Sequence, residues 1–414
     1  MFSRWKTRLL AEKLKKPYVH ILFGARQTGK STLLKTLIPK PDLFIDLSNP
    51  EERSRYLARP GDLVAECRAL SPAGRTPPLV FIDEVQAVPE MFNAVQNLYD
   101  GDKHGWRFIL CGSSARKLRQ TGANMLPGRS MLHRLYPLTL AEHPSTEHVA
   151  PNIESPLPFP WDKKEKNPRP FPAWDLFTRL TYGELPGIVT ADKEDRAGLL
   201  KSYAIIHLEE EIRREALIKD WGAFTRFLQL AAMESGTLLN YANISQHVGV
   251  SQPTIKSYYQ LLEDMFVGFS VPAFSKSPRK NLLSTPKFFF FDTGVRHAAA
   301  RLEITQEIVK ANPGPVFEQW VGTELWKRLQ YSGGTLYHLR TKDGAEIDFI
   351  VEHKGRYVPV EVKWTEHPSL SDARHILRFL DESPDRKSKG YIICRCSKPM
   401  LLHDRVMALP WFHL

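Results

Sequence analysis

The first residues able to do chemistry lie near the start of the sequence, in the stretch VHILFGARQTGKSTLL. Gly24, Gly29, Lys30 and Ser31 have the spacing GxxxxGKS, after an apolar strand and before a helical stretch. In such a loop the backbone N–H groups cradle phosphate oxygens, the lysine reaches the β- and γ-phosphates, and the hydroxyl binds Mg²⁺. The motif predicts a nucleotide site formed by Gly24, Ala25, Arg26, Gln27, Thr28, Gly29, Lys30, Ser31 and Thr32.

A second motif favours this interpretation over a glycine-rich turn that matches by chance. The strand in PPLVFIDEVQ ends in Asp83 and Glu84. We expect Asp83 to hold the Mg²⁺ together with Ser31, and Glu84 to polarise the attacking water. The other interpretation of an acidic pair at a strand end is a helix cap. The sequence has no guanine-reading NKxD motif, so ATP is the expected nucleotide.

Polar residues further along could complete the ATP site. FILCGSSARKL places Ser113 and Ser114 at another strand tip, where a hydroxyl could sense the γ-phosphate or simply cap the next helix. Arg129 and Arg134 follow in PGRSMLHRLYPLTLAE. Either could act as an arginine finger that stabilises charge on the γ-phosphate, with Arg129 the stronger candidate. The alternative for both is a surface ion pair, the commoner role of an arginine.

A second constellation lies in GAEIDFIVEHKGRYVPVEVKW, residues 344–364. Apolar and polar residues alternate on both sides of a turn at Lys354-Gly355, as in two antiparallel strands. A two-residue turn places Asp348 opposite Glu361, where like charges repel. A Mg²⁺ ion between the two carboxylates removes the conflict. Lys363 shares their face, because side chains alternate with period two, and could orient or deprotonate a water.

Two alternatives stay open for this segment. Glu346 falls opposite Lys363 in the same register, so a surface ion pair would also explain the lysine. An odd-length turn would shift the register by one residue and separate the two carboxylates.

A third pattern is a helix-turn-helix in LLNYANISQHVGVSQPTIKSYYQLLEDMF. Gly249 is expected in the turn and Ser251 at the cap of a second helix, which leaves Gln252, Thr254 and Lys256 outward, where a recognition helix meets DNA. The basic stretch FSKSPRKNLLSTPK then suits a wing on the phosphate backbone, with Arg279 and Lys280 as contacts. The alternative for this region is that it packs as a lid or binds protein.

These motifs need several structural units to position them. A chain of 414 residues predicts two or three domains. Buried strands alternate with helices over residues 1–142, which predicts a parallel α/β sheet. Residues 143–173 are rich in proline and charge, which indicates an insertion or linker. Residues 174–311 are predicted to form a helical and winged-helix region. Residues 312–414 are predicted to form a mixed α/β unit.

Composition limits the partners. The formal net charge is +11, which favours nucleic acid, here DNA. No apolar run approaches the ~18 residues of a membrane span. Four scattered cysteines fit a reducing compartment, and we expect a cytoplasmic location.

Together, GARQTGKSTL, VFIDEVQ, GSSARKL and PGRSMLHRLYPLTLAE resemble the prokaryotic ATPases of the extended AAA class. In that family a P-loop domain precedes a winged helix and a C-terminal domain, described in many members as restriction-endonuclease-like. AEID and VEVK likewise resemble the two halves of the PD-(D/E)xK nuclease core. The resemblance implies catalytic roles for Asp348, Glu361 and Lys363, and for Glu318 on the preceding helix, with Glu324 as a second candidate.

The expected fold is therefore α/β: a P-loop NTPase sheet, a winged-helix middle and a nuclease-like α/β end. The expected function is an ATPase that binds DNA and cleaves it with a metal-dependent C-terminal site. The alternative is a nucleotide-gated DNA- or protein-binding switch whose nuclease-like domain does not cleave. Association between copies of the chain is compatible with either.

Overall fold

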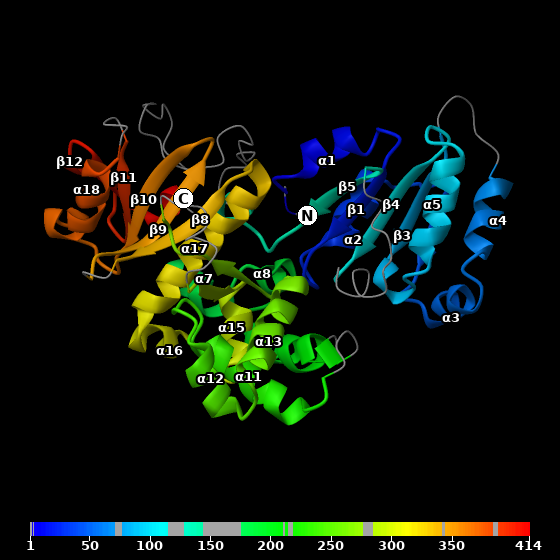
Figure 1. The fold of residues 1–414 in the computed structure, drawn as a ribbon. Helices are drawn as coiled ribbons and strands as arrows, with labels where there is room; N and C mark the ends of the chain where they lie inside the picture. Colours follow the sequence, from blue (N-terminus) through cyan, green and yellow to red (C-terminus); the bar gives the residue numbers. More distant parts are fainter. Residues whose placement is uncertain are drawn as a thin grey trace.

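The computed structural model describes residues 2, 4–70, 77–114, 128–143, 175–209, 212–213, 218–275, 285–341, 344–383 and 388–414. Three regions lie around the long helix α17 (Pro313–Ser332), which is drawn in yellow in Figure 1. Arg279, Lys280 and residues 144–173 fall outside the described residues.

The N-terminal region is a parallel sheet with helices on both faces. Its strands lie in the order β2-β3-β4-β1-β5, all parallel. The helices are α1 (Thr7–Lys13), α2 (Lys30–Leu37), α3 (Pro50–Ala58), α4 (Asp62–Ala69) and α5 (Met91–Gly101). The strands are β1 (Val19–Phe23), β2 (Leu43–Asp46), β3 (Leu79–Asp83), β4 (Arg107–Gly112) and β5 (Ser130–Arg134), with short turns η1 (Val85–Ala87) and η2 (Leu140–Glu142).

Both faces of this sheet are buried, as the continuous apolar strands predict. Ile21 and Phe23 of β1 pack in a core with α4 and α5. Leu22 points to the other face and packs with residues of α1 and α2. The first four strands match the prediction, whereas β5 was missed because its sequence, SMLHR, has only two apolar residues.

The middle region is mainly helical. Its elements are α7 (Leu176–Tyr182), α8 (Pro186–Thr190), α9 (Arg196–Ser202), the π-helix η3 (Tyr203–Glu209), α11 (Trp221–Met233), α12 (Tyr241–Val248), α13 (Gln252–Asp264), β6 (Gly268–Val271), β7 (Lys287–Phe290), α15 (Thr293–Ala299) and α16 (Gln306–Ala311). The two helices predicted for the helix-turn-helix are α12 and α13. Gly249 ends α12 with φ 81°, and the Ser251 hydroxyl accepts from the Thr254 N–H at the start of α13.

The C-terminal region is a six-stranded sheet in the order β12-β13-β11-β10-β9-β8. Its elements after α17 are β8 (Thr335–Arg340), β9 (Glu346–His353), β10 (Arg356–Val362), η4 (Leu370–Ala373), α18 (Arg374–Asp381), β11 (Gly390–Cys394), β12 (Met400–His403), β13 (Val406–Pro410) and η5 (Trp411–His413). Helix α17 covers one face through Phe349 and Val360, and α18 covers the other through Ile376 and Ile392.

Helix α17 is buried on nearly every side and contacts all three regions. Its Lys327 ammonium donates to the Leu138 carbonyl, and its Glu324 carboxylate accepts from the Leu140 N–H. Its Trp320 indole N–H donates to Glu184 of the middle region at 2.9 Å. At 1.5 Å per residue, its 20 residues span about 30 Å. The helix therefore connects the end of the N-terminal region with both other regions.

Candidate functional site

The phosphate loop has the backbone geometry that its motif requires. It leaves β1 and enters α2, with Gly29 at φ 88° as the residue before the helix and Gln27 also left-handed at φ 60°. A Cβ on Gly24 would lie 2.1 Å from the Leu135 carbonyl oxygen, so only glycine fits there. The Lys30 ammonium is buried and donates to the Gly24 and Ala25 carbonyls at 2.8 and 2.9 Å. The loop thus folds around the ammonium of its own lysine.

The acidic pair lies at the same edge of the sheet. Because β1, β3 and β4 are parallel, their carboxyl ends meet there, and β4 separates the loop from Asp83. Burial raises the pKa of the Cys111 thiol well above its usual range, and both Asp83 and Lys30 act on that thiol electrostatically. Lys30 and Asp83 therefore lie near the same buried thiol at this edge of the sheet.

Glu84 is held in an unusual backbone conformation beside this point. Its φ is 53°, a left-handed value that is uncommon for a residue with a side chain and occurs often at active sites. Its carboxylate accepts from the Gln86 amide, which also donates to the Ser113 hydroxyl at 2.9 Å. Ser113 is thus placed beside the predicted base. Gln86 was missed, although it stands in the same VFIDEVQ motif.

A second missed residue supports the loop from outside. The Arg4 guanidinium is buried and donates to the Thr28 carbonyl at 2.7 Å and to the Tyr136 carbonyl. It also lies 3.3 Å from the Glu142 carboxylate. Arg4 therefore ties a carbonyl of the phosphate loop to the segment after β5.

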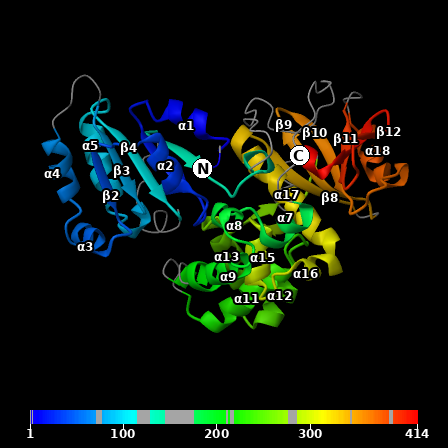
Figure 2. The same cartoon turned by 180° about the vertical axis from the view of Figure 1, so that it is seen from behind.

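The middle region packs against the loop from another side. Figure 2 shows α8 beside α2, and a Cβ on Gly29 would lie 3.9 Å from Pro186 at the start of α8. Ala25 belongs to the same hydrophobic core as the helices of the middle region.

The structure does not bring Arg129 to this site. It lies at the start of β5, at the opposite edge of the parallel sheet, and its Nε is 2.5 Å from Asp100. Its predicted role as a finger on this chain's own nucleotide is wrong, because strand geometry separates the two. Arg134 lies at the other end of β5, paired in register with Phe23, which immediately precedes the loop. Its guanidinium stacks on the Phe266 ring.

The C-terminal carboxylates lie where two strands separate. Lys354 and Gly355 both have positive φ, as a two-residue type I′ turn requires, and the register pairs His353 with Arg356 as predicted. The ladder between β9 and β10 ends at Phe349 and Val360. Beyond it, the Asp348 carboxylate accepts from the Val362 N–H at 2.8 Å.

The electrostatics of Asp348 and Glu361 would favour a bound cation. Burial and the neighbouring carboxylates of Glu318 and Glu361 raise the pKa of Asp348 well above its usual range. Burial also raises the pKa of Glu361, although Lys363 acts against it from 2.7 Å. Glu361 is 6% exposed, and its Oε2 is buried without a hydrogen-bond partner. A buried carboxylate oxygen with no donor fits an oxygen-binding cation such as Mg²⁺.

The contacts settle one alternative for these residues. Lys363 pairs with Glu361, not with Glu346, so the ion pair across the register is wrong. Glu346 lies instead 3.5 Å from the Lys287 ammonium, which also binds Glu318 at 2.9 Å. Lys287 was missed because it comes from β7, far from this motif in the sequence.

Glu318 and Glu324 have different roles. Glu318 faces the carboxylate cluster through its contact with Lys287. Glu324 is buried away from it, bound by Lys327 and Arg328 and by the Leu140 N–H, so it cannot substitute for Glu318. Across the described part of the chain, no three or more His, Cys, Asp and Glu side chains together could hold a metal ion. An ion here would therefore rest on Asp348 and Glu361 as its two side-chain ligands.

The outward face of α13 is open. Gln252 and Lys256 are exposed, Thr254 is half-buried, and the Lys256 ammonium lies 5.3 Å from the Tyr241 ring centre. Ile255 and Tyr259 point inward and are buried. The described helices include none long and apolar enough to cross a membrane.

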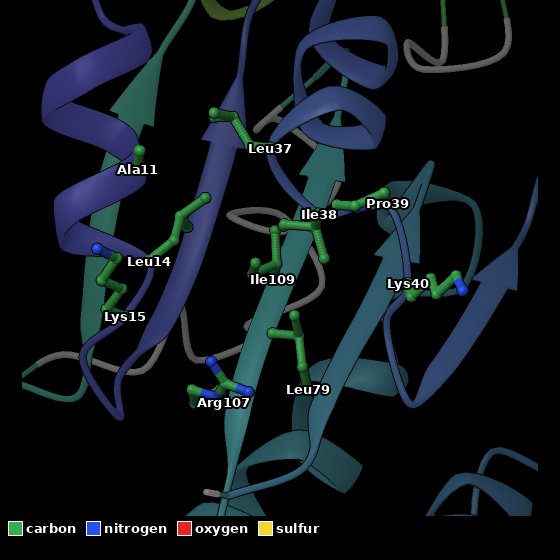
Figure 3. Close-up of a pocket in the computed structure, with 10 residues that line it drawn as sticks. All are labelled: Ala11, Leu14, Lys15, Leu37, Ile38, Pro39, Lys40, Leu79, Arg107 and Ile109. Atoms are coloured by element: carbon green, nitrogen blue, oxygen red, sulfur yellow. The ribbon is translucent and has the colours of Figure 1, made fainter.

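A pocket of about 350 Å³ lies elsewhere, between α1, α2 and the N-terminal sheet (Figure 3). Its apolar floor includes Leu14, Leu79 and Ile109, and Lys15 and Arg107 stand at its rim. Leu79 and Arg107 begin their strands, so this pocket lies at the edge opposite the phosphate loop.

Family comparisons agree with this geometry. Residues 16–143 match the family described as AAA domain. This match supports an AAA-type ATPase domain over these residues. Residues 173–306 and 313–414 match two further families, each described as a domain of unknown function, DUF8612 and DUF4143. These two matches name no activity for the rest of the chain.

Similar proteins span most of the chain. An uncharacterized protein of Mycobacterium tuberculosis is 26% identical over 366 residues, 87% of this chain and 74% of that protein. One from Haemophilus influenzae is 22% identical over 88% of this chain and 87% of its own length.

Solved structures with some likeness include C. elegans PCH-2, with 17% identity over 63% of this chain and 65% of that chain, TM-score 0.24. A DNA polymerase III gamma subunit-related protein of Thermotoga maritima has 11% identity over 63% of this chain and 98% of that chain, TM-score 0.26. These scores are too low to relate the folds, so the assignment rests on the family match and the site geometry.

Proposed function

We propose that the chain binds ATP with Mg²⁺ and hydrolyses it at the carboxyl edge of the N-terminal sheet. The observation that carries this proposal is the convergence of Lys30, Asp83 and Glu84 at one sheet edge. There the Lys30 ammonium donates to two loop carbonyls, and the β- and γ-phosphates would accept from the same ammonium. Ser31 and Asp83 would hold the Mg²⁺.

Glu84 would orient the attacking water, with Gln86 fixing its carboxylate. Ser113, hydrogen-bonded to the same amide, lies where a hydroxyl can report on the γ-phosphate. Each of these roles needs a fixed geometry, and the left-handed backbone at Glu84 supplies it.

The test is ATP binding and turnover in three variants. Lys30→Ala should lose binding, since the loop loses its phosphate-directed charge. Glu84→Gln should keep binding and lose turnover by about 10²-fold or more, the range for a positioned base. Glu90→Gln changes an exposed glutamate nearby and should match the parent. Turnover retained in both Lys30→Ala and Glu84→Gln would overturn the proposal.

A second proposed activity, DNA cleavage, rests on the C-terminal carboxylates. The separated strands and the unpartnered Glu361 Oε2 suit a divalent cation between Asp348 and Glu361. Such an ion would lower the pKa of a bound water and stabilise charge on a scissile phosphate. Lys363, on the same face and half-exposed, would orient that water or neutralise the phosphate.

DNA would be held by the middle region, which we propose to be a winged helix. Three helices, α11, α12 and α13, precede the β6–β7 hairpin, and Gln252 and Lys256 are exposed on the second helix of the turn. Thr254 is half-buried beside them, and the predicted Arg279 and Lys280 contacts lie in the segment between β6 and β7. The high net positive charge agrees with such a partner.

Nicking of supercoiled plasmid in Mn²⁺ separates cleavage from the alternative, a nucleotide-gated switch that only grips its partner. Asp348→Asn should abolish nicking, whereas Asp404→Asn, in an exposed turn, should not change it. DNA binding without nicking in the parent would favour the switch. If the parent neither binds nor nicks DNA, DNA is removed from the proposal and only the ATPase activity remains.

A further inference from the structure

Lys287 brings a buried positive charge from the middle region into the C-terminal carboxylate cluster. It is 5% exposed, and a lysine is rarely so buried unless it is paired. Its backbone is fixed on two sides, by pairing with Val271 in the hairpin and by a bridge to Leu238. The side chain therefore reaches the cluster from a rigid support.

The direct contacts divide the cluster into two halves, although Glu318 and Lys287 also act electrostatically, in opposite directions, on Asp348. In one half, the Lys287 ammonium binds Glu318 at 2.9 Å and lies 3.5 Å from Glu346. In the other half, Glu361 has one oxygen on Lys363 and one without a partner, and Asp348 accepts from a backbone N–H.

The charges agree with this division. When all groups are ionised, the lysines Lys287 and Lys363 leave two of the four negative charges uncompensated, which one divalent cation would neutralise. A second divalent ion beside Glu318 would meet the ammonium of Lys287 at close range, where like charges repel strongly.

We propose that Lys287 is a built-in cation that fills one of two cation positions in this cluster, so that the site binds a single divalent ion between Asp348 and Glu361. The proposal rests on the carboxylate site proposed above. It adds the number of ions that the site binds and names Lys287 as the residue that sets this number. Glu318 is then a partner of Lys287 and not a ligand of the ion. Because Lys287 belongs to the β6–β7 pair of strands, the one-ion stoichiometry holds only when that pair is docked on the C-terminal sheet.

The test is Mn²⁺ binding to the full-length, nucleotide-free, metal-stripped protein, measured by calorimetry and by counting bound Mn²⁺ with electron paramagnetic resonance. All proteins carry Lys30→Ala, so that the phosphate loop contributes no site. The parent should bind one Mn²⁺. Lys287→Met should bind a second ion, or bind the first at least tenfold more tightly. Lys310→Met, an exposed lysine on α16, is the matched control and should change nothing.

Glu318→Gln is the second variant, which keeps the proposal testable if Lys287→Met does not fold. Its side chain is partly exposed, so the change is tolerable, and Mn²⁺ affinity should stay within about threefold of the parent. Loss of Mn²⁺ binding in Glu318→Gln would make Glu318 a ligand and overturn the proposal. One ion at unchanged affinity in Lys287→Met would also overturn it while leaving the carboxylate site intact. No Mn²⁺ bound by the parent would remove the site itself.

Discussion

Replacing Arg4 by glutamine tests whether the segment before α1 supports the phosphate loop. The change removes the donors to the Thr28 and Tyr136 carbonyls and the ion pair with Glu142, all of them buried. Removing one partner of a buried ion pair costs about 3–5 kcal/mol, and we take about 3 kcal/mol because Glu142 keeps backbone donors.

This cost converts into a measurable shift in melting temperature. An unfolding entropy of about 2.1 cal/mol/K per residue gives about 0.9 kcal/mol/K for the 414 residues. A loss of about 3 kcal/mol then lowers the Tm by about 3 °C if the chain unfolds together, and by more if the ATPase region melts alone. ATP affinity should also fall by about fivefold, the equivalent of one hydrogen bond of about 1 kcal/mol to the loop.

Scanning fluorimetry and fluorescent-nucleotide titration measure both effects, and Arg8→Gln is the control. Arg8 pairs with Glu12 on α1 at 3.5 Å, but the two side chains are 88% and 62% exposed, so its loss should change stability by under about 0.5 kcal/mol. If Arg4→Gln melts within 1 °C of Arg8→Gln and binds ATP equally well, Arg4 does not support the loop.

Three further predictions concern the other regions. Gly322→Ala should destabilise the protein by about 1–3 kcal/mol in urea unfolding, because its Cβ would lie 2.5 Å from the Phe349 ring, whereas Gly314→Ala on the same helix meets open space and should be neutral. Burial lowers the pKa of His297 to about 4, so on acidification the unfolded chain binds a proton at higher pH than the folded chain does. The free energy of unfolding should therefore fall by up to about 3 kcal/mol as the pH drops from about 6.5 to 4. An equally steep fall in His297→Gln would contradict this. Lys256→Ala should reduce the salt dependence of DNA binding by about one phosphate contact, and an unchanged slope in fluorescence anisotropy would exclude that contact.

The local parts of both sites could be predicted from sequence because each depends on one short segment. The phosphate loop follows from glycines at fixed spacing, and the pairing of His353 with Arg356 follows from a period of two and a two-residue turn. The turn between α12 and α13 follows from a cap at Ser251 and a left-handed Gly249. In each case the residues that decide the geometry are neighbours in the chain.

The parts that were missed join segments distant in sequence. Lys287 meets Glu318 across 31 positions, and no periodicity links them. Arg4 looks like any other basic residue of a charged N-terminal stretch, although its guanidinium reaches the phosphate loop. Arg129 was misplaced for a related reason, since a residue's position at the start or the end of a strand depends on strand bounds that SMLHR does not reveal. Periodicity indicates which face of an element is buried, but not which other element covers it.

The central position of α17 has a consequence for the exchange of the C-terminal region between proteins. A family boundary begins at residue 313, the first residue of this helix, so a cut there would look natural in sequence. In the folded chain such a cut would separate the Lys327 ammonium from the Leu138 carbonyl that accepts from it. It would also separate the Glu324 carboxylate from the Leu140 N–H that donates to it. A transplanted C-terminal unit would keep the ion pairs of Glu324 with Lys327 and Arg328, but it would lose these two backbone partners. Recombination at this point would therefore succeed only if the recipient brought a matching segment after its last strand, so the three regions are expected to be inherited together.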